Sequence, residues 1–293
     1  MRRPKMKTLK KESGLNKLAR ILIVMLLVAI ALYTLLPFVW MVSASFKSEK
    51  DVMSVPIKWI PDSFKLDNFK RVLNIDTKST TNYHFMLAYW NSIKVSVIST
   101  ICSVSSAAMA GYAFAKLNFR GSKVLFIVYL AQLMVPTQLT LIPRFLLFSA
   151  VDLNNSHLAL ILPKVVSVSS TFLVRQAFVS APSELREAAK IDGAGEFRIW
   201  WNIMLPLVKP TLAAIATVDF LASWNDYLDP LVFLSDWEKR TLPLALNQFI
   251  GTEVTQYNLI MAACCLTVIP VFVVFLSGQK FFLKGLTVGA VKG

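Results

Sequence analysis

Residues 21–42 read ILIVMLLVAIALYTLLPFVWMV, and no charged side chain interrupts them. A helix of about 20 apolar residues spans the hydrocarbon core of a bilayer. The apolar core of a secretory signal peptide is shorter, at about 7–15 residues. The stretch therefore predicts an uncleaved membrane-spanning helix, which we place at residues 21–46.

The composition of the whole chain also indicates a membrane protein. Hydrophobic residues make up 55% of the 293 residues and charged residues only 16%, whereas about 25% of a soluble domain is charged. The formal net charge of +14 would suggest a nucleic-acid partner in a soluble protein. In a membrane protein, Lys and Arg collect in cytoplasmic loops instead. Because no soluble domain is long enough to hold a nucleic acid, we expect a lipid bilayer and no nucleic acid around this chain.

Further apolar stretches predict five more spans. They cover about residues 92–115, 124–148, 158–178, 208–234 and 259–276. Residues 1–20 hold eight Lys and Arg against one acid, and such a bias marks the cytoplasmic side. We therefore expect an all-α polytopic membrane protein with six transmembrane helices and both termini in the cytoplasm. Its parts in order are a basic tail, the first span, an outer segment, a five-helix core and a cytoplasmic tail, at residues 1–20, 21–46, 47–90, 91–283 and 284–293.

The second predicted span carries a small side chain at every fourth position. These residues are Ser99, Ser103, Ala107, Gly111 and Ala115. On a helix they form one stripe, and stripes of small side chains let membrane helices approach closely. We expect this stripe to pack against another span or against a partner subunit.

A polar segment at residues 179–207 separates the fourth and fifth predicted spans. Its central part, residues 187–206, reads EAAKIDGAGEFRIWWNIMLP. We expect a short helix over residues 183–191 that ends at Gly193, because glycine tolerates the positive φ of a helix end. A second short helix at residues 194–202 brings tryptophans to the membrane boundary, where this residue is enriched.

The skeleton Glu-Ala-Ala-x3-Gly-x9-Ile-x-Leu-Pro of this segment resembles the EAA loop in the membrane subunits of bacterial ABC importers. Other stretches, including LLPFVWMVSASFKS, MVPTQLTLIP, SWNDYLDPLVF and GLTVGAVKG, are similar to the carbohydrate-type permeases of that family. The similarity covers nearly the full chain and is to the six-span permease subunit of maltose and other sugar importers. It implies a cytoplasmic coupling loop that contacts an ATPase through Glu187, Ala188, Ala189, Asp192, Gly193, Ile203, Leu205 and Pro206.

The resemblance also implies the assembly and the cargo. The partners would be a second permease subunit, two ATPase subunits and an extracytoplasmic solute-binding protein, in a bacterial inner or plasma membrane. The chain would import sugars or oligosaccharides, and ATP would be hydrolysed on the partner ATPases. A polyol or glycerol phosphate remains an alternative cargo, and a secondary transporter remains an alternative class, although no clear internal repeat supports it. The chain has no GxxxxGK[ST] phosphate loop, so we expect no enzymatic activity, and we expect neither a cofactor nor a metal.

Polar residues inside predicted spans indicate a translocation path. Such groups are costly in hydrocarbon and usually face a bundle interior. The candidates are Gln132, Gln138, Asp219, Asn225 and Asp226, and amides and carboxylates beside aromatic rings suit sugar hydroxyls. We expect Lys164, near the outer end of the fourth span, to extend to the membrane surface.

Overall fold

The computed structural model describes residues 14–75, 84–250 and 256–290 and is all-helical in architecture. Three long helices, α1, α4 and α15, cover Gly14–Ser45, Phe85–Lys116 and Tyr257–Ala290. The longer of the remaining helices are α5, α6, α8, α9 and α12, at Ser122–Ala131, Leu141–Ala150, Val168–Ser180, Glu184–Ile191 and Lys209–Trp224. Short α-helical turns are α2, α3, α7, α10, α11, α13 and α14, at Glu49–Val52, Asp67–Val72, His157–Ile161, Glu196–Ile199, Leu205–Leu207, Leu228–Phe233 and Leu242–Ala245.

Four helical segments are long and apolar enough to cross a membrane by themselves. They are Lys17–Ser45, Phe85–Lys116, His157–Ser180 and Tyr257–Lys280. Two further apolar segments are bent, by 93° between α5 and α6 and by 79° between α11 and α12. The described residues therefore hold four to six candidate spans, and the number six is reached when each bent pair is one span.

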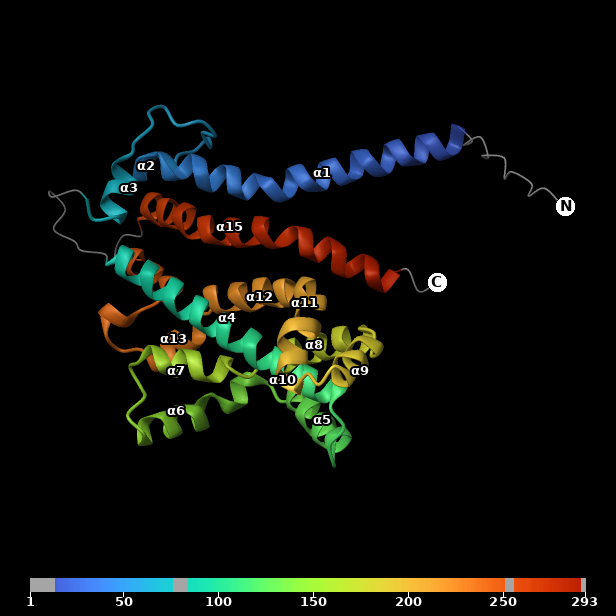
Figure 1. The fold of residues 1–293 in the computed structure, drawn as a ribbon. Helices are drawn as coiled ribbons and strands as arrows, with labels where there is room; N and C mark the ends of the chain where they lie inside the picture. Colours follow the sequence, from blue (N-terminus) through green and yellow to red (C-terminus); the bar gives the residue numbers. More distant parts are fainter. Residues whose placement is uncertain (1–13, 76–83, 251–255, 291–293) are drawn as a thin grey trace.

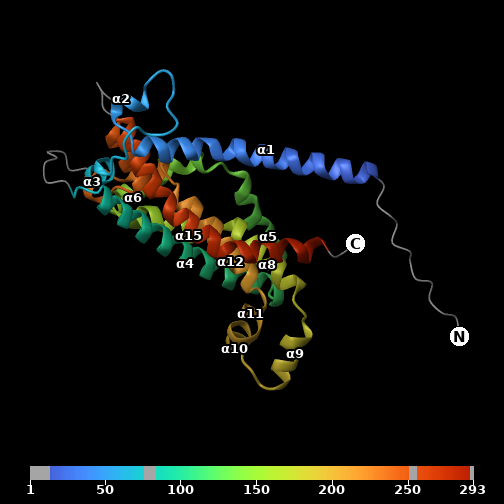
Figure 2. The same cartoon turned by 90° about the horizontal axis from the view of Figure 1, so that it is seen from above.

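The long helices lie side by side, with α4 in contact with α8 and α12, and α15 between α12 and α1 (Figure 1). The view from above shows α9, α10 and α11 projecting away from the other helices (Figure 2). The side chains of residues 17–39 on α1 are all exposed. From residue 21 to residue 39 no side chain is charged, and a regular helix pairs its own backbone groups, so this part of α1 can face lipid.

The stripe of small side chains on α4 packs within this chain. Ser99, Ser103 and Ala107 are at most 2% exposed. A Cβ atom on Gly111 would lie only 2.9 Å from Cγ1 of Val174 on α8, so the two helices approach each other too closely there for a larger side chain. The predicted packing face thus joins α4 to neighbouring spans.

The helix bounds differ from the expected segment bounds in several places. The expected third span at residues 124–148 is interrupted, because Pro136 follows Val135 in an extended conformation and a residue before proline is disfavoured in the α region. The expected fourth and fifth spans are interrupted at residues 162–167 and 225–227. At the ends, α1 begins within the expected basic tail, α4 begins within the expected outer segment, and α15 continues into the expected C-terminal tail. Residues 1–13 and 291–293 of those tails lie outside the described residues.

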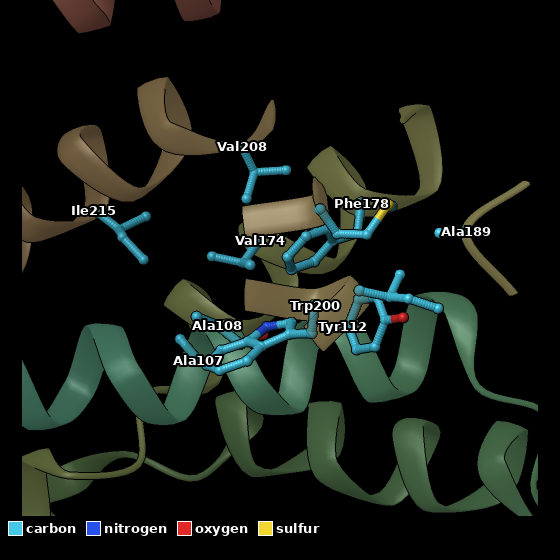
Figure 3. Close-up of a cluster of buried hydrophobic side chains, with 11 residues drawn as sticks. Ala107, Ala108, Tyr112, Val174, Phe178, Ala189, Trp200, Val208 and Ile215 are labelled. Carbon is cyan, nitrogen blue, oxygen red and sulfur yellow. The ribbon is translucent and has the colours of Figure 1, made fainter. Parts of the chain in front are cut away.

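Two apolar clusters lie near opposite ends of α12. We call the first the loop cluster, and it consists of Ala107, Ala108, Tyr112, Val174, Phe178, Ala189, Ile199, Trp200, Met204, Val208 and Ile215 (Figure 3). We call the second the turn cluster, and it consists of Val95, Phe148, Ala159, Leu160, Ile161, Phe233 and Leu234. The loop cluster supports the segment at residues 179–207, and the turn cluster joins α6 and α7 to α13.

Candidate functional site

Helix α9 ends in the turn that the sequence predicts. Gly193 has φ +80°, and its N–H donates to the Lys190 carbonyl at 3.0 Å. The N–H of Ala194 donates to the Ala189 carbonyl at 2.9 Å. These two bonds form a Schellman motif, in which a glycine in the left-handed region satisfies the last carbonyls of a helix. The chain thereby reverses direction between α9 and α10.

The segment after this turn is fixed to the bundle by large buried side chains. Ile199 and Met204 are fully buried, and Trp200 is 8% exposed. The Trp200 ring lies over α4 (Figure 3), and its Nε1 donates to the Ala108 carbonyl at 3.3 Å. Burying side chains of this size dominates packing energetics, so the base of the loop is held firmly to α4 and α8.

Glu196 joins three elements at the edge of the loop cluster. Its Oε1 lies 2.5 Å from Nη2 of Arg186 and 2.7 Å from Nζ of Lys190, both on α9. The Tyr112 hydroxyl on α4 donates to Oε2 at 2.8 Å. Desolvation alone would raise the pKa of Glu196, but the hydrogen bonds from Lys190, Arg186 and Tyr112 outweigh it and lower the pKa to about 2. The charged carboxylate therefore ties α9 to α10 and to α4.

The ion pairs and hydrogen bond of Glu196 were not predicted from the sequence. Arg186 and Lys190 stand four residues apart, a spacing that places both on one face of a helix, and an acid just beyond the turn was a usable signal. Nothing in the local pattern pointed to Tyr112, which is 84 residues from Glu196.

The predicted coupling residues do not share one surface. Ala189 is buried in the loop cluster, whereas Glu187, Ala188, Asp192 and Gly193 are exposed. Ala188 and Ala189 were both expected at the ATPase contact, but they point in different directions because about 100° separates neighbouring residues on a helix.

The last three predicted residues lie along the entry to α12. Ile203 and Leu205 are partly buried against the loop cluster. Pro206 lies inside α11, and the chain bends after it, at Val208. A proline is tolerated there because the first turn of a helix needs no amide donor.

Asp219 lies where α4, α8 and α12 meet. The Ser103 hydroxyl donates to its Oδ2 at 2.7 Å, and the Ser170 hydroxyl lies 3.0 Å from both carboxylate oxygens. Within the described residues, Asp219 forms no ion pair. A carboxylate between membrane helices that is held by hydroxyl groups alone marks an unusual position in the bundle.

Asp226 forms an ion pair with Lys164, and the distance from Nζ to Oδ2 is 2.6 Å. We expected Lys164 to extend to the membrane surface, and its ammonium group lies against a carboxylate in the turn after α12. A second pair was missed altogether: Arg144 binds Asp229 in a bidentate manner at 2.9 and 3.2 Å. An arginine inside an apolar stretch was a signal in itself, since an ionised group in a membrane needs a partner.

The remaining path candidates are exposed and neutral. Asn225 lies in the turn after α12, and its side-chain amide donates to the Leu221 carbonyl at 2.9 Å. Gln132 and Gln138 flank the interruption between α5 and α6. The contacts of the described residues join neither glutamine to Asp219 or Asp226, so the structure does not gather all five candidates into one site. The described part of the chain also holds no cluster of possible metal ligands.

Comparisons with known proteins agree with this architecture. Residues 105–288 match the family described as binding-protein-dependent transport system inner membrane component. The arabinooligosaccharides transport system permease protein AraQ of Halalkalibacterium halodurans is 35% identical, over 90% of this chain and 93% of that protein. The sn-glycerol-3-phosphate transport system permease protein UgpE of Yersinia pestis is 33% identical, over 90% of this chain and 94% of that protein.

A solved structure shows the same fold. A chain of a bacterial ABC transporter involved in the import of the acidic polysaccharide alginate aligns with a TM-score of 0.82 and 25% identity. The alignment covers 94% of this chain and all of that one. The matched family spans more than half of the sequence, and the chain therefore belongs to the binding-protein-dependent transport system inner membrane components.

Proposed function

We propose that this chain is the permease subunit of a bacterial ABC importer for sugars or oligosaccharides. The observation that carries the proposal is the 35% identity to an arabinooligosaccharide permease over 90% of the chain. Glycerol phosphate is the second candidate cargo, because the UgpE relatives are 33% identical over the same share of the chain.

In this proposal, residues 179–207 transmit force from a separate ATPase. Glu187 and Ala188 are exposed on α9 and form the contact surface, and the Glu187 carboxylate offers a charge-assisted hydrogen bond to a basic partner group. Ala189 faces the opposite way and packs α9 onto the chain itself. Because α9 is tied to α10 and α4 through Glu196, a displacement of α9 moves the start of α12 as a rigid body.

The proposed topology has six spans, with each bent helix pair counted once. The beginning of α1 and the end of α15 lie toward the same side of the molecule as α9 (Figure 1). An ATPase contact at α9 places that side, and both termini, in the cytoplasm. A second permease subunit, two ATPases and an extracytoplasmic solute-binding protein complete the assembly in the bacterial cell membrane. Gln132, Gln138, Asp219, Asn225 and Asp226 line the path.

The test is transport by the assembled complex, copurified from its native membrane and placed in liposomes. We expect uptake of labelled arabino-oligosaccharides that requires both ATP and the ATPase subunits. Preferential uptake of sn-glycerol 3-phosphate would favour the second cargo. Uptake by this chain without ATP would contradict the importer and indicate a secondary transporter.

A further inference from the structure

The turn between α12 and α13 and the first turn of α13 carry two carboxylates that bind two interrupted membrane segments at once. Asp226 and Asp229 lie three residues apart, and the N–H of Asp229 donates to Oδ1 of Asp226 at 3.3 Å. Asp229 binds Arg144 on α6, and Asp226 binds Lys164 at the end of the 3₁₀ turn Leu162–Lys164. Residues 226–229 therefore hold one segment from each of two interrupted spans.

Both ion pairs are shielded from water. Their four side chains are between 15% and 23% exposed, whereas the exposed pair of Lys58 and Asp62 shows 49% and 65%. Removing one partner of a shielded pair leaves an uncompensated charge, which is far more costly than losing a surface pair. Each pair is therefore expected to break only when the segments that carry it move apart.

Additional contacts give the two cations defined positions. The guanidinium of Arg144 lies 5.5 Å from the centre of the Phe233 ring, which belongs to the turn cluster. Lys164 Nζ also lies 3.4 Å from the Ser223 hydroxyl on α12. Helix α12 has 16 residues and is about 24 Å long, so the pairs lie a full helix length from the loop.

We propose that Arg144 and Lys164 are positioning residues that close the translocation path at the end remote from the coupling loop. They clamp α6 and the Leu162–Lys164 turn onto the turn after α12. When the path opens on this side, these segments separate and both pairs break. The inference rests on the proposed function, because it assumes a path that opens alternately on its two sides.

The first test measures access to the turn cluster in the full complex in nanodiscs, without nucleotide. Cys102, Cys264 and Cys265 are replaced by Ala, and Ala159, which is fully buried in the turn cluster, is replaced by Cys. The rate of labelling by a membrane-impermeant maleimide is then measured. We expect Asp229→Asn to raise this rate about tenfold, the change that follows when an open state grows from about 1% to about 10% of the population. The exchange Arg144→Asp with Asp229→Arg should restore the original rate. The control Asp62→Asn should leave it unchanged.

An unchanged labelling rate in Asp229→Asn, or a failed rescue by the charge exchange in a folded complex, would overturn the proposal. A second measurement replaces the ion pair by a covalent link that can be broken again. With Cys102, Cys264 and Cys265 replaced by Ala and without the labelling cysteine, Arg144→Cys and Asp229→Cys are joined by a short bifunctional thiol reagent that a reductant cleaves. We expect ATP-driven uptake to stop on crosslinking and to return on cleavage. Full uptake by the crosslinked complex would overturn the proposal that these segments separate when the path opens. The labelling test needs no solute, so it tests the role of the two ion pairs independently of transport. An unmodified complex without ATP-driven uptake would refute the proposed function but not this role.

Discussion

The two ends of α12 are held by different chemistry. At its beginning, the loop segment is fixed by buried apolar side chains, with Ile199 and Met204 fully buried and the charged Glu196 at the edge, where its side chain is 37% exposed. At its end, the apolar turn cluster is supplemented by two shielded ion pairs that bind α6 and the Leu162–Lys164 turn. Apolar burial is non-directional and grows with contact area, whereas an ion pair is made or broken over a short distance. The comparison indicates a stiff element at one end of α12 and a switchable one at the other.

The largest expected effect is at the stiff end. Trp200→Ala removes a ring that is 8% exposed, and truncating a buried aromatic residue costs about 3–5 kcal/mol. The matched control is Trp201→Ala, because Trp201 is the adjacent residue and is 57% exposed. We expect unfolding measurements in detergent to show a much larger loss for Trp200→Ala. Equal losses in the two variants would show that the loop cluster does not hold the loop.

The next largest loss of stability is expected at the end of α12, where the ion pairs lie. Asp229→Asn leaves the Arg144 charge without its partner, and we expect a loss of about 2–3 kcal/mol, below the 3–5 kcal/mol of a fully buried pair. The same unfolding measurement on Asp62→Asn should give a change near zero, because that pair is exposed. An unchanged free energy of unfolding for Asp229→Asn would show that the shielded pair is worth no more than the exposed pair in this chain.

A smaller effect tests the turn after α9. Gly193 and Gly195 both have open space where an added Cβ atom would lie, but of these two glycines only Gly193 has a positive φ, at +80°. An L-residue in the left-handed region costs about 1–2 kcal/mol. Gly193→Ala should therefore destabilise the loop, seen as faster amide exchange in α9, while Gly195→Ala should not. Similar exchange in both variants would contradict the role of the turn.

The smallest effect is a pH dependence at Glu196. Its folded-state pKa of about 2 is below the ordinary value of 4.5, so its stabilisation is fully present above about pH 4.5 and is lost as the pH falls toward 2. The stability difference between the unmodified chain and Glu196→Gln should be constant from pH 7 to 5 and should narrow below that. If this stability difference widened as the pH fell, the hydrogen bonds of Glu196 would not favour its charged form, contrary to the assignment.

The sequence predicts the helical class, the small-residue stripe and the turn at Gly193, because each depends on local periodicity or on the conformational freedom of one residue. It does not predict the partners of Arg144 and Lys164, which lie 85 and 62 residues away along the chain. It also assigns Ala188 and Ala189 together to the ATPase contact, whereas the packing of α9 against α10 and residues 200–204 buries only Ala189 of the two. Contacts set by tertiary packing are the part that local patterns leave open.

The most direct test of the account is ATP-driven uptake by the reconstituted complex carrying Glu187→Lys. Glu187 is exposed and forms no ion pair within the described residues, so expression, insertion and assembly of the bundle should persist. We expect uptake to fall by about tenfold or more, because a reversed charge at the ATPase contact opposes a coupling that is worth at least about 1.4 kcal/mol. Unchanged uptake in a correctly inserted variant would contradict the proposal that α9 couples this permease to its ATPase.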